Sequence, residues 1–287
     1  MPFYFFAWIA AFSYGLVAII VKLTSKYSVK NPWLFNFLFQ LFVLLIICPI
    51  ALANGATFAK HWDSLIIASV FFALFGIFYY LAMSKIDVSV FSPLFNFRAI
   101  ISVLLASLFL EESLKPTQIP LIVFIFISGL FVSIDEHFSL KSFFKPGIFF
   151  ALASVFSLAL NNLFIKKAIM ENSYWQLTLW QYLIAQTILL LTIPKFYKDI
   201  KKIKLKQIGS ILILALVFVV GELAGNKAYA DNVGISSIII SLPVSMLLAF
   251  AFSIFAPKLL EKHAFKVYAI RFTAAAIMII SALKLST

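Results

Sequence analysis

Residues 208–230 read IGSILILALVFVVGELAGNKAYA, and this apolar stretch is long enough to cross a bilayer as a helix. It holds only two charged residues, Glu222 and Lys227. The rest of the 287-residue chain is similar, since 63% of its residues are hydrophobic, 12% are charged and the mean hydropathy is +1.06. A soluble domain has about one-quarter charged residues. The composition therefore excludes soluble, disordered and nucleic-acid-binding proteins and predicts a polytopic membrane protein.

Short polar breaks divide the chain into ten stretches of this kind. The candidate spans are 3–23, 33–53, 64–84, 89–110, 118–134, 147–167, 176–194, 208–230, 236–256 and 265–284. The longest breaks, 135–146 and 195–207, are too short to hold a soluble domain. We therefore expect an all-α integral membrane protein with ten transmembrane helices.

Residues of the first half recur in the second half at nearly constant spacing. Phe6-Ala7, Phe12-Ser13 and Lys22 return 144 residues later, and Pro93 and Glu111 return 150 residues later as Pro243 and Glu261. The sequence thus predicts a five-helix repeat over 1–138 and a second over 139–287. Because five is odd, the two copies enter the membrane from opposite sides. Secondary transporters use such inverted repeats for alternating access, with the substrate near the midplane.

A span with Pro93 inside it ends in Leu110-Glu111-Glu112, and an apolar helix with Gly129 follows. With ten spans and a five-helix duplication, this pattern resembles the EamA family of the drug/metabolite transporter superfamily. The second copy departs from the pattern, with Pro257-Lys258 and Ala274-Ala275-Ala276 where the family has glycine. The resemblance implies export or exchange of small metabolites, commonly amino acids, without ATP hydrolysis.

Two charged residues lie deep in predicted spans, Arg98 and Glu222, where charges are costly and usually functional. At 1.5 Å per residue they lie roughly 15 Å and 20 Å from the same side of the membrane. Three interpretations stay open. They form a structural ion pair, or Arg98 binds a carboxylate or phosphate while Glu222 takes an amine or a coupling proton, or they face different cavities.

Other polar and aromatic residues in the spans are candidate substrate ligands. They are Asn226, Asn161, Gln181, Tyr79, Tyr80 and Ser241. Buried amides need partners for both donor and acceptor, which favours Asn161 and Gln181. Pro93 and Pro243 each remove a backbone hydrogen bond and are candidate hinges, or static bends.

Enzymatic patterns are weak in this sequence. His61, His137 and His263 lie singly, without the spacing of metal ligands, and no Gly-rich phosphate loop is present. We expect no catalytic residues, no metal, no cofactor and no nucleic-acid partner. The expected partners are a small-molecule substrate, with proton coupling as an option, and membrane lipid. Ten helices suffice for a complete pathway, so we expect a monomer, in a prokaryotic plasma membrane.

Two arguments about orientation disagree. Most lysines lie in loops after odd-numbered spans, and the positive-inside rule then places both termini outside. The family resemblance implies termini inside.

Two other functions stay open beside the small-metabolite transporter. A flippase or carrier for a lipid-linked or phosphorylated substrate would need Lys227 or Arg271 beside Arg98 in the cavity. A non-transporting membrane scaffold would have no continuous aqueous cavity between the two halves.

Overall fold

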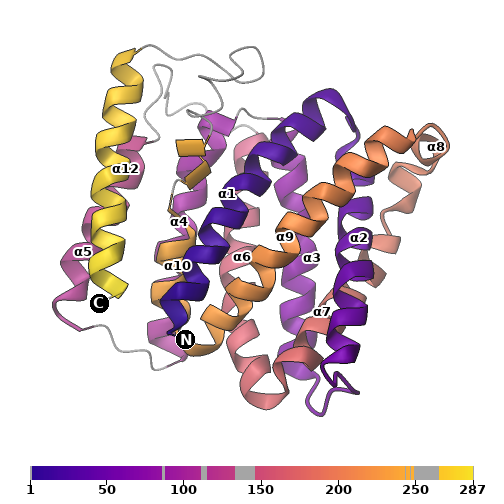
Figure 1. Cartoon of the computed structure of the whole chain (residues 1–287), viewed down its shortest axis with the longest axis horizontal. Coiled ribbons are helices and arrows are strands. Elements are labelled where there is room, and N and C mark those ends of the chain that lie inside the picture. The colour runs from indigo at the N-terminus through magenta and orange to yellow at the C-terminus, as the bar shows by residue number, and fades with distance from the viewer. Residues whose placement is uncertain are drawn as a thin grey trace.

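The computed structural model describes residues 2–85, 88–110, 115–132, 146–242, 244–245, 247–248 and 265–286, and these are largely helical (Figure 1). The helices of the first half are α1 (Phe3–Tyr27), α2 (Pro32–Ala53), α3 (Asp63–Met83), α4 (Val88–Phe109) and α5 (Gln118–Val132). Those of the second half are α6 (Pro146–Glu171), α7 (Tyr174–Leu190), the 3-10 helix η2 (Ile193–Lys195), α8 (Tyr197–Ile200), α9 (Leu205–Asp231), α10 (Val233–Ile240) and α12 (Phe265–Ser286).

Among the described residues, five helices are long and apolar enough to cross a membrane, namely α1, α2, α3, α6 and α9. Large apolar side chains also cover the outside of the bundle, where a soluble protein would carry charge. Exposed examples are Phe12, Leu45, Leu104, Phe149, Ile213 and Val220. The all-helical, multi-pass membrane architecture expected from the composition is thus confirmed.

Helix ends follow local capping chemistry. Asn31 caps α2, since its Oδ1 accepts hydrogen bonds from the backbone N–H groups of Trp33 (3.0 Å) and Leu34 (3.3 Å). Ser173 and Gln176 form a capping box at the start of α7. The expected bounds of these spans therefore agree with the structure to within a few residues.

One expected span, 236–256, differs from the structure. Helix α10 ends at Ile240, and Ser241 and Leu242 are not helical. The physical reason is local, because a residue that precedes proline is disfavoured in the α conformation, and Leu242 precedes Pro243. Pro243 itself lies outside the described residues.

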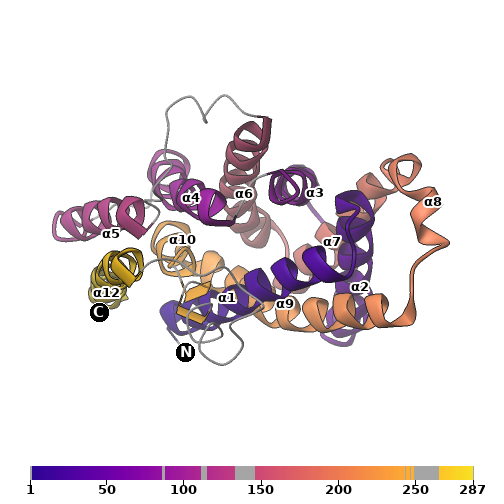
Figure 2. The same cartoon turned by 90° about the horizontal axis from the view of Figure 1, so that it is seen from above.

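Helices of the two halves pack against one another in corresponding pairs. Helix α3 packs against α6 as α9 packs against α1, and α4 packs against α6 as α10 packs against α1. In the same way α3 contacts α7 as α9 contacts α2, while α2–α7, α4–α10 and α5–α12 each join a helix of the first half to one of the second. Figure 2 shows α5 and α12 side by side at one edge and α2, α7 and α8 at the other.

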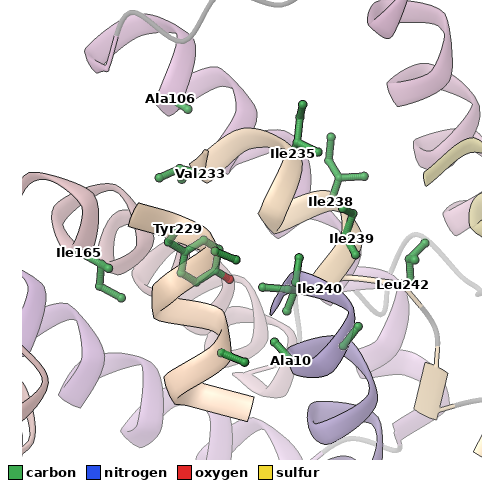
Figure 3. Packing of buried hydrophobic residues seen from close by; sticks show 14 of the residues in the cluster. Ala10, Ala106, Ile165, Tyr229, Val233, Ile235, Ile238, Ile239, Ile240 and Leu242 are labelled. Carbon is green, nitrogen blue, oxygen red and sulfur yellow. The ribbon is translucent and has the colours of Figure 1, made fainter. Parts of the chain in front are cut away.

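Every residue of α10 is buried, which suits its run of isoleucines. Figure 3 shows these side chains beside Tyr229 of α9, Ile165 of α6 and Ala10 of α1. A helix that is hydrophobic on all sides belongs in the interior of a bundle. Helix α10 therefore lies at the centre, and its last turn reaches the cavity described below.

The crossing of α1 and α9 depends on small residues. A Cβ atom added at Gly221 would lie 2.8 Å from Cβ of Ser13 and 3.3 Å from the ring of Tyr14. Small residues let membrane helices approach closely and gain packing contacts. Gly221 thus sets how near Tyr14 comes to α9.

We expect Gly221→Ala to destabilise the protein by about 1–3 kcal/mol, because the added methyl group forces α1 away from α9. The measurement is thermal unfolding of detergent-solubilised protein, followed by reaction of the only cysteine, Cys48, with a thiol-reactive dye. Gly225→Ala is the matched control on the same helix, since its nearest neighbour, the Tyr14 hydroxyl, would lie 3.4 Å from the new Cβ. Equal unfolding midpoints for the two variants would contradict the close-packing argument.

Candidate functional site

A cavity of about 180 Å³ lies between the two halves of the bundle. Helices α1, α2, α3, α4, α6, α9 and α10 all contribute to its wall. Most of the candidate residues line it, namely Arg98, Glu222, Asn226, Asn161, Tyr79, Tyr80 and Ser241. Gln181 lies behind the wall. The fold therefore brings side chains from both halves of the sequence to one place.

Arg98 of α4 is 3% exposed and is held against the end of α10. Its Nη2 and Nε donate to the Ser241 hydroxyl at 2.8 and 3.2 Å, and its guanidinium lies 5.0 Å from the centre of the Phe95 ring. The Ser241 hydroxyl in turn donates to the carbonyl of Ser237. Because α10 ends just before Ser241, the broken span presents this hydroxyl directly to the guanidinium.

Glu222 of α9 is 5% exposed and is held by neutral donors. Its Oε2 accepts a hydrogen bond of 2.6 Å from the Tyr14 hydroxyl, and its Oε1 accepts one of 3.3 Å from Nδ2 of Asn226. Tyr14 reaches this position because it packs against Gly221 and Gly225, which flank the carboxylate on α9. The α1–α9 crossing therefore places the carboxylate.

Arg98 and Glu222 line the same cavity, yet their closest polar partners are different residues. The structure thus shows neither the direct ion pair nor two separate cavities. A cavity with a guanidinium in one wall and a carboxylate in another suits a ligand that carries both an anionic and a cationic group.

The rest of the wall divides into an aromatic and a polar part. The aromatic part comes mainly from the first half and consists of Phe39, Phe72, Phe75, Tyr79, Tyr80, Phe91, Phe95 and Phe218. Its rings pack on one another, since Tyr79 lies 5.2 Å from both Tyr80 and Phe91 between ring centres. The polar part comes mainly from the second half and includes Asn161, Asn162, Glu222, Asn226, Tyr229 and Ser241. A bound molecule would meet two chemically different faces.

Gln181 supports the polar part from behind. Its Nε2 donates to Oδ1 of Asn161 at 3.0 Å, and both residues are buried. Asn162, the next residue, has its Nδ2 3.4 Å from the Ser237 hydroxyl. Gln181 therefore does not line the cavity but positions the side chain of Asn161, which does.

Tyr14 and Asn162 line the cavity but were not among the candidates predicted from the sequence. Tyr14 stands next to Gly15 in an apolar run, and nothing in the sequence links it to Glu222, 208 residues away. Asn162 directly follows the candidate Asn161, and this position was the feature of the sequence that could have indicated it. Of the two candidate hinges, Pro93 lies within the continuous helix α4, and Pro243 lies outside the described residues.

In the part of the chain that the structure describes, no group of three or more His, Cys, Asp and Glu residues is arranged to hold a metal ion. His61 lies in the α2–α3 connection, where its backbone N–H donates to Asn172.

Three comparisons with known proteins bear on this fold. A family model described as "EamA-like transporter family" matches residues 1–134. No curated protein sequence matches the chain. A solved structure titled "Crystal structure of protein" is similar with a TM-score of 0.71 and 13% identity, over 99% of this chain and 98% of that chain. At this identity the likeness shows the fold alone.

We expect Ser241→Ala to cost about 1–3 kcal/mol of stability, because it leaves a buried guanidinium without its hydroxyl partner. Ser236→Ala is the matched control on the same helix, since the Ser236 hydroxyl is buried and donates to the neutral carbonyl of Ala228. Its loss removes a neutral hydrogen bond and costs about 0.5–1.5 kcal/mol. Thermal unfolding midpoints compare the two, and a larger loss for Ser236→Ala would contradict the assignment.

Proposed function

We propose, from the match of residues 1–134 to the EamA-like transporter family model, that the chain is a secondary transporter of small organic metabolites, of the amino-acid class. It exports or exchanges them by alternating access between two inverted five-helix repeats. The observation that carries this proposal is the cavity between the halves, with Arg98 and Glu222 in its wall. The ligand is a zwitterion whose carboxylate meets Arg98, whose ammonium group meets Glu222, and whose side chain meets the aromatic part.

The pairing of helices supports the repeat. The helices α1, α2, α3, α4 and α5 correspond in order to α6, α7, α9, α10 and α12. When each helix is replaced by its equivalent, every contact described above between the halves becomes another observed contact or is unchanged. The start of α1 and the end of α12 lie at the same end of the bundle (Figure 1). Both facts agree with two copies of a five-helix unit related by a two-fold axis in the membrane plane.

At each end of the bundle, hydrogen bonds between connecting segments close the space between the two halves. Rocking of the halves would open these two closures in turn. At one end Asn172 of the α6–α7 connection accepts hydrogen bonds from the backbone N–H groups of Lys60 (2.9 Å) and His61 (3.1 Å). At the other end Nδ2 of Asn31, in the α1–α2 connection, donates to Asp199 at 2.6 Å. In both cases a loop between the first two helices of one half holds a loop of the other half.

The alternative functions receive less support. Of the described residues that line the cavity, Arg98 is the sole cation, which suits a carboxylate better than a phosphate. Lys227 is exposed, and its Nζ lies 4.7 Å from the centre of the Phe6 ring instead. A non-transporting scaffold has no use for a cavity of this composition. We propose that the protein acts as a monomer in a prokaryotic plasma membrane, with Glu222 as the proton-coupling group.

We expect Arg98→Ala and Glu222→Gln each to reduce substrate flux in proteoliposomes at least about tenfold, because a charge-assisted hydrogen bond contributes more than the 1.4 kcal/mol that a tenfold change represents. The substrate is first found by a thermal-shift screen against amino acids, nucleosides and drugs, since a ligand of the folded state raises its stability. Lys227→Ala is the control and keeps wild-type flux. Unchanged flux in both site variants would remove these residues from the mechanism, and a loss in Lys227→Ala would favour a phosphorylated substrate.

Alternating access predicts that a covalent bridge across one closure stops transport. In a chain with Cys48 replaced, His61→Cys and Asn172→Cys are joined by a short bifunctional methanethiosulfonate, because Nδ2 of Asn172 lies 2.8 Å from the His61 carbonyl oxygen. We expect flux to fall at least about tenfold and to return after reduction, since the closed end can no longer open. Each single-cysteine protein with the same reagent is the control. Full flux in the bridged protein would rule out opening at this end.

A further inference from the structure

Four polar side chains are buried where α2, α3 and α7 meet, beside the cavity. Asn36 and Gln40 belong to α2 and are 2% and 3% exposed, and Tyr182 and Gln186 belong to α7 and are 1% and 7% exposed. Four of their polar atoms have no hydrogen-bond partner among the described residues. These are Oδ1 of Asn36, Oε1 of Gln40, and both Oε1 and Nε2 of Gln186.

Contacts with α3 bring Asn36 of α2 and Tyr182 of α7 to one junction. A Cβ atom on Gly76 would lie 2.9 Å from Oδ1 of Asn36, and the Phe72 ring lies 5.1 Å from the Tyr182 ring. Phe72 and Gly76 are one helical turn apart, so they share a face of α3. Both of them line the cavity together with Gln40. The junction is therefore continuous with the cavity.

The carboxylate of Glu222 lies at the inner end of this junction. The Tyr182 hydroxyl interacts electrostatically with Glu222, whose Oε1 and Oε2 already accept hydrogen bonds from Asn226 and Tyr14. From there the polar atoms continue toward one end of the bundle. Asn36 lies one turn before Gln40 on α2, and Gln186 lies one turn after Tyr182 on α7. Because α2 and α7 run antiparallel, both steps lead toward the end that carries α8 (Figure 1).

Leaving these atoms without partners would be costly, at about 1–3 kcal/mol for each buried polar group. Folded proteins avoid this cost with ordered water, at about one buried molecule per 27 residues, each making about three hydrogen bonds. Four polar side chains that face one junction offer such a molecule several partners. Apolar sites stay dry, whereas the side chains buried at this junction are amides and a hydroxyl.

We propose that the α2–α3–α7 junction holds a row of ordered water molecules through which Glu222 exchanges protons with the end of the bundle that carries α8. This inference rests on the proposed function, in which Glu222 is the proton-coupling group. A proton from bulk water passes along the hydrogen bonds of the row, each water giving up one proton as it accepts another. The last transfer converts the carboxylate of Glu222 into the neutral acid, so one proton is moved in total.

Titratable and charged groups surround Glu222 on several helices. They are Tyr14 of α1, Arg98 of α4, Tyr174 and Tyr182 of α7, and Tyr229 of α9. The Tyr174 hydroxyl is engaged with the carbonyl of Leu223, at 2.7 Å. Tyr182 is the member of this set that lies in the junction, so it stands between the water row and the carboxylate.

Hydroxyl-radical footprinting of the purified full-length protein tests the water row without any substrate. X-rays generate radicals from bound water, and these oxidise neighbouring side chains even when they are buried. We expect Tyr182 to be labelled at a rate close to that of the cavity residue Tyr79, and Phe35, which is 1% exposed, to stay unlabelled. In Gln186→Leu, and separately in Asn36→Leu, the labelling of Tyr182 falls about tenfold, because apolar side chains hold no water.

The proton route is tested in the same variants by infrared spectroscopy after a rapid drop in pH. The signal is the carboxylic-acid band that Glu222→Gln removes. We expect this band to form at least about tenfold more slowly in Gln186→Leu and Asn36→Leu, since protons lose their hydrogen-bonded path. Thr178→Val is the matched control, because Thr178 is buried one turn before Tyr182 on α7 and its hydroxyl donates to the carbonyl of Tyr174. It should keep the wild-type rate.

The outcomes separate the inference from the function on which it rests. An unlabelled Tyr182 would show a dry junction and overturn the proposal. A labelled Tyr182 with an unchanged protonation rate in both leucine variants would overturn the proton route. If the Glu222 band never forms at any pH, the coupling role of Glu222 fails, while the labelling of Tyr182 still decides whether the junction holds water.

Discussion

The low polarity of the bilayer is the constraint on which this structure depends. A helix in hydrocarbon satisfies its backbone internally, but a polar side chain must find a partner from another helix or from water. The polar residues buried in the spans accordingly pair with one another, since Arg98 meets Ser241, Glu222 meets Tyr14 and Asn226, and Gln181 meets Asn161. Each of the first two groups joins helices from different halves of the chain. The same constraint that buries these side chains thus also assembles the cavity.

Much of the fold could be predicted from the sequence because the signal is simple. A run of about 20 apolar residues has few alternatives in a membrane, and caps such as Asn31 and Ser173 mark where helices begin. The end of α10 was harder to predict. The hydrophobicity of 236–256 continues past Pro243, so composition indicates one uninterrupted span. In the structure α10 ends at Ile240, Ser241 and Leu242 are not helical, and the described residues 244–245 and 247–248 are helical again. The restriction that proline places on Leu242 is a local backbone effect that a hydropathy pattern does not register.

The site was predictable where a residue type is itself costly in lipid. Arg98, Glu222, Asn161 and Asn226 stand out in any apolar span, and the structure places all four around one cavity. Ser241 was among the candidates, but its pairing with Arg98 was not predictable, and Tyr14 was not a candidate at all, because both contacts join residues more than 140 positions apart in sequence. The similar depths of Arg98 and Glu222 made a direct ion pair one of the three interpretations. Depth along a helix axis, however, does not give the direction in which a side chain points.

The hydrogen bonds between Arg98 and Ser241 have a mechanical consequence. They fasten α4 of the first half to the interrupted end of α10 in the second half. A carboxylate that enters the cavity and accepts both guanidinium donors competes directly with the serine hydroxyl for them. Binding of this carboxylate would then release one half of the bundle from the other at the binding site itself. Ligand binding and the release of α4 from α10 would then be the same event, in which Arg98 exchanges the Ser241 hydroxyl for the ligand carboxylate. While the cavity is empty, the two halves would stay linked.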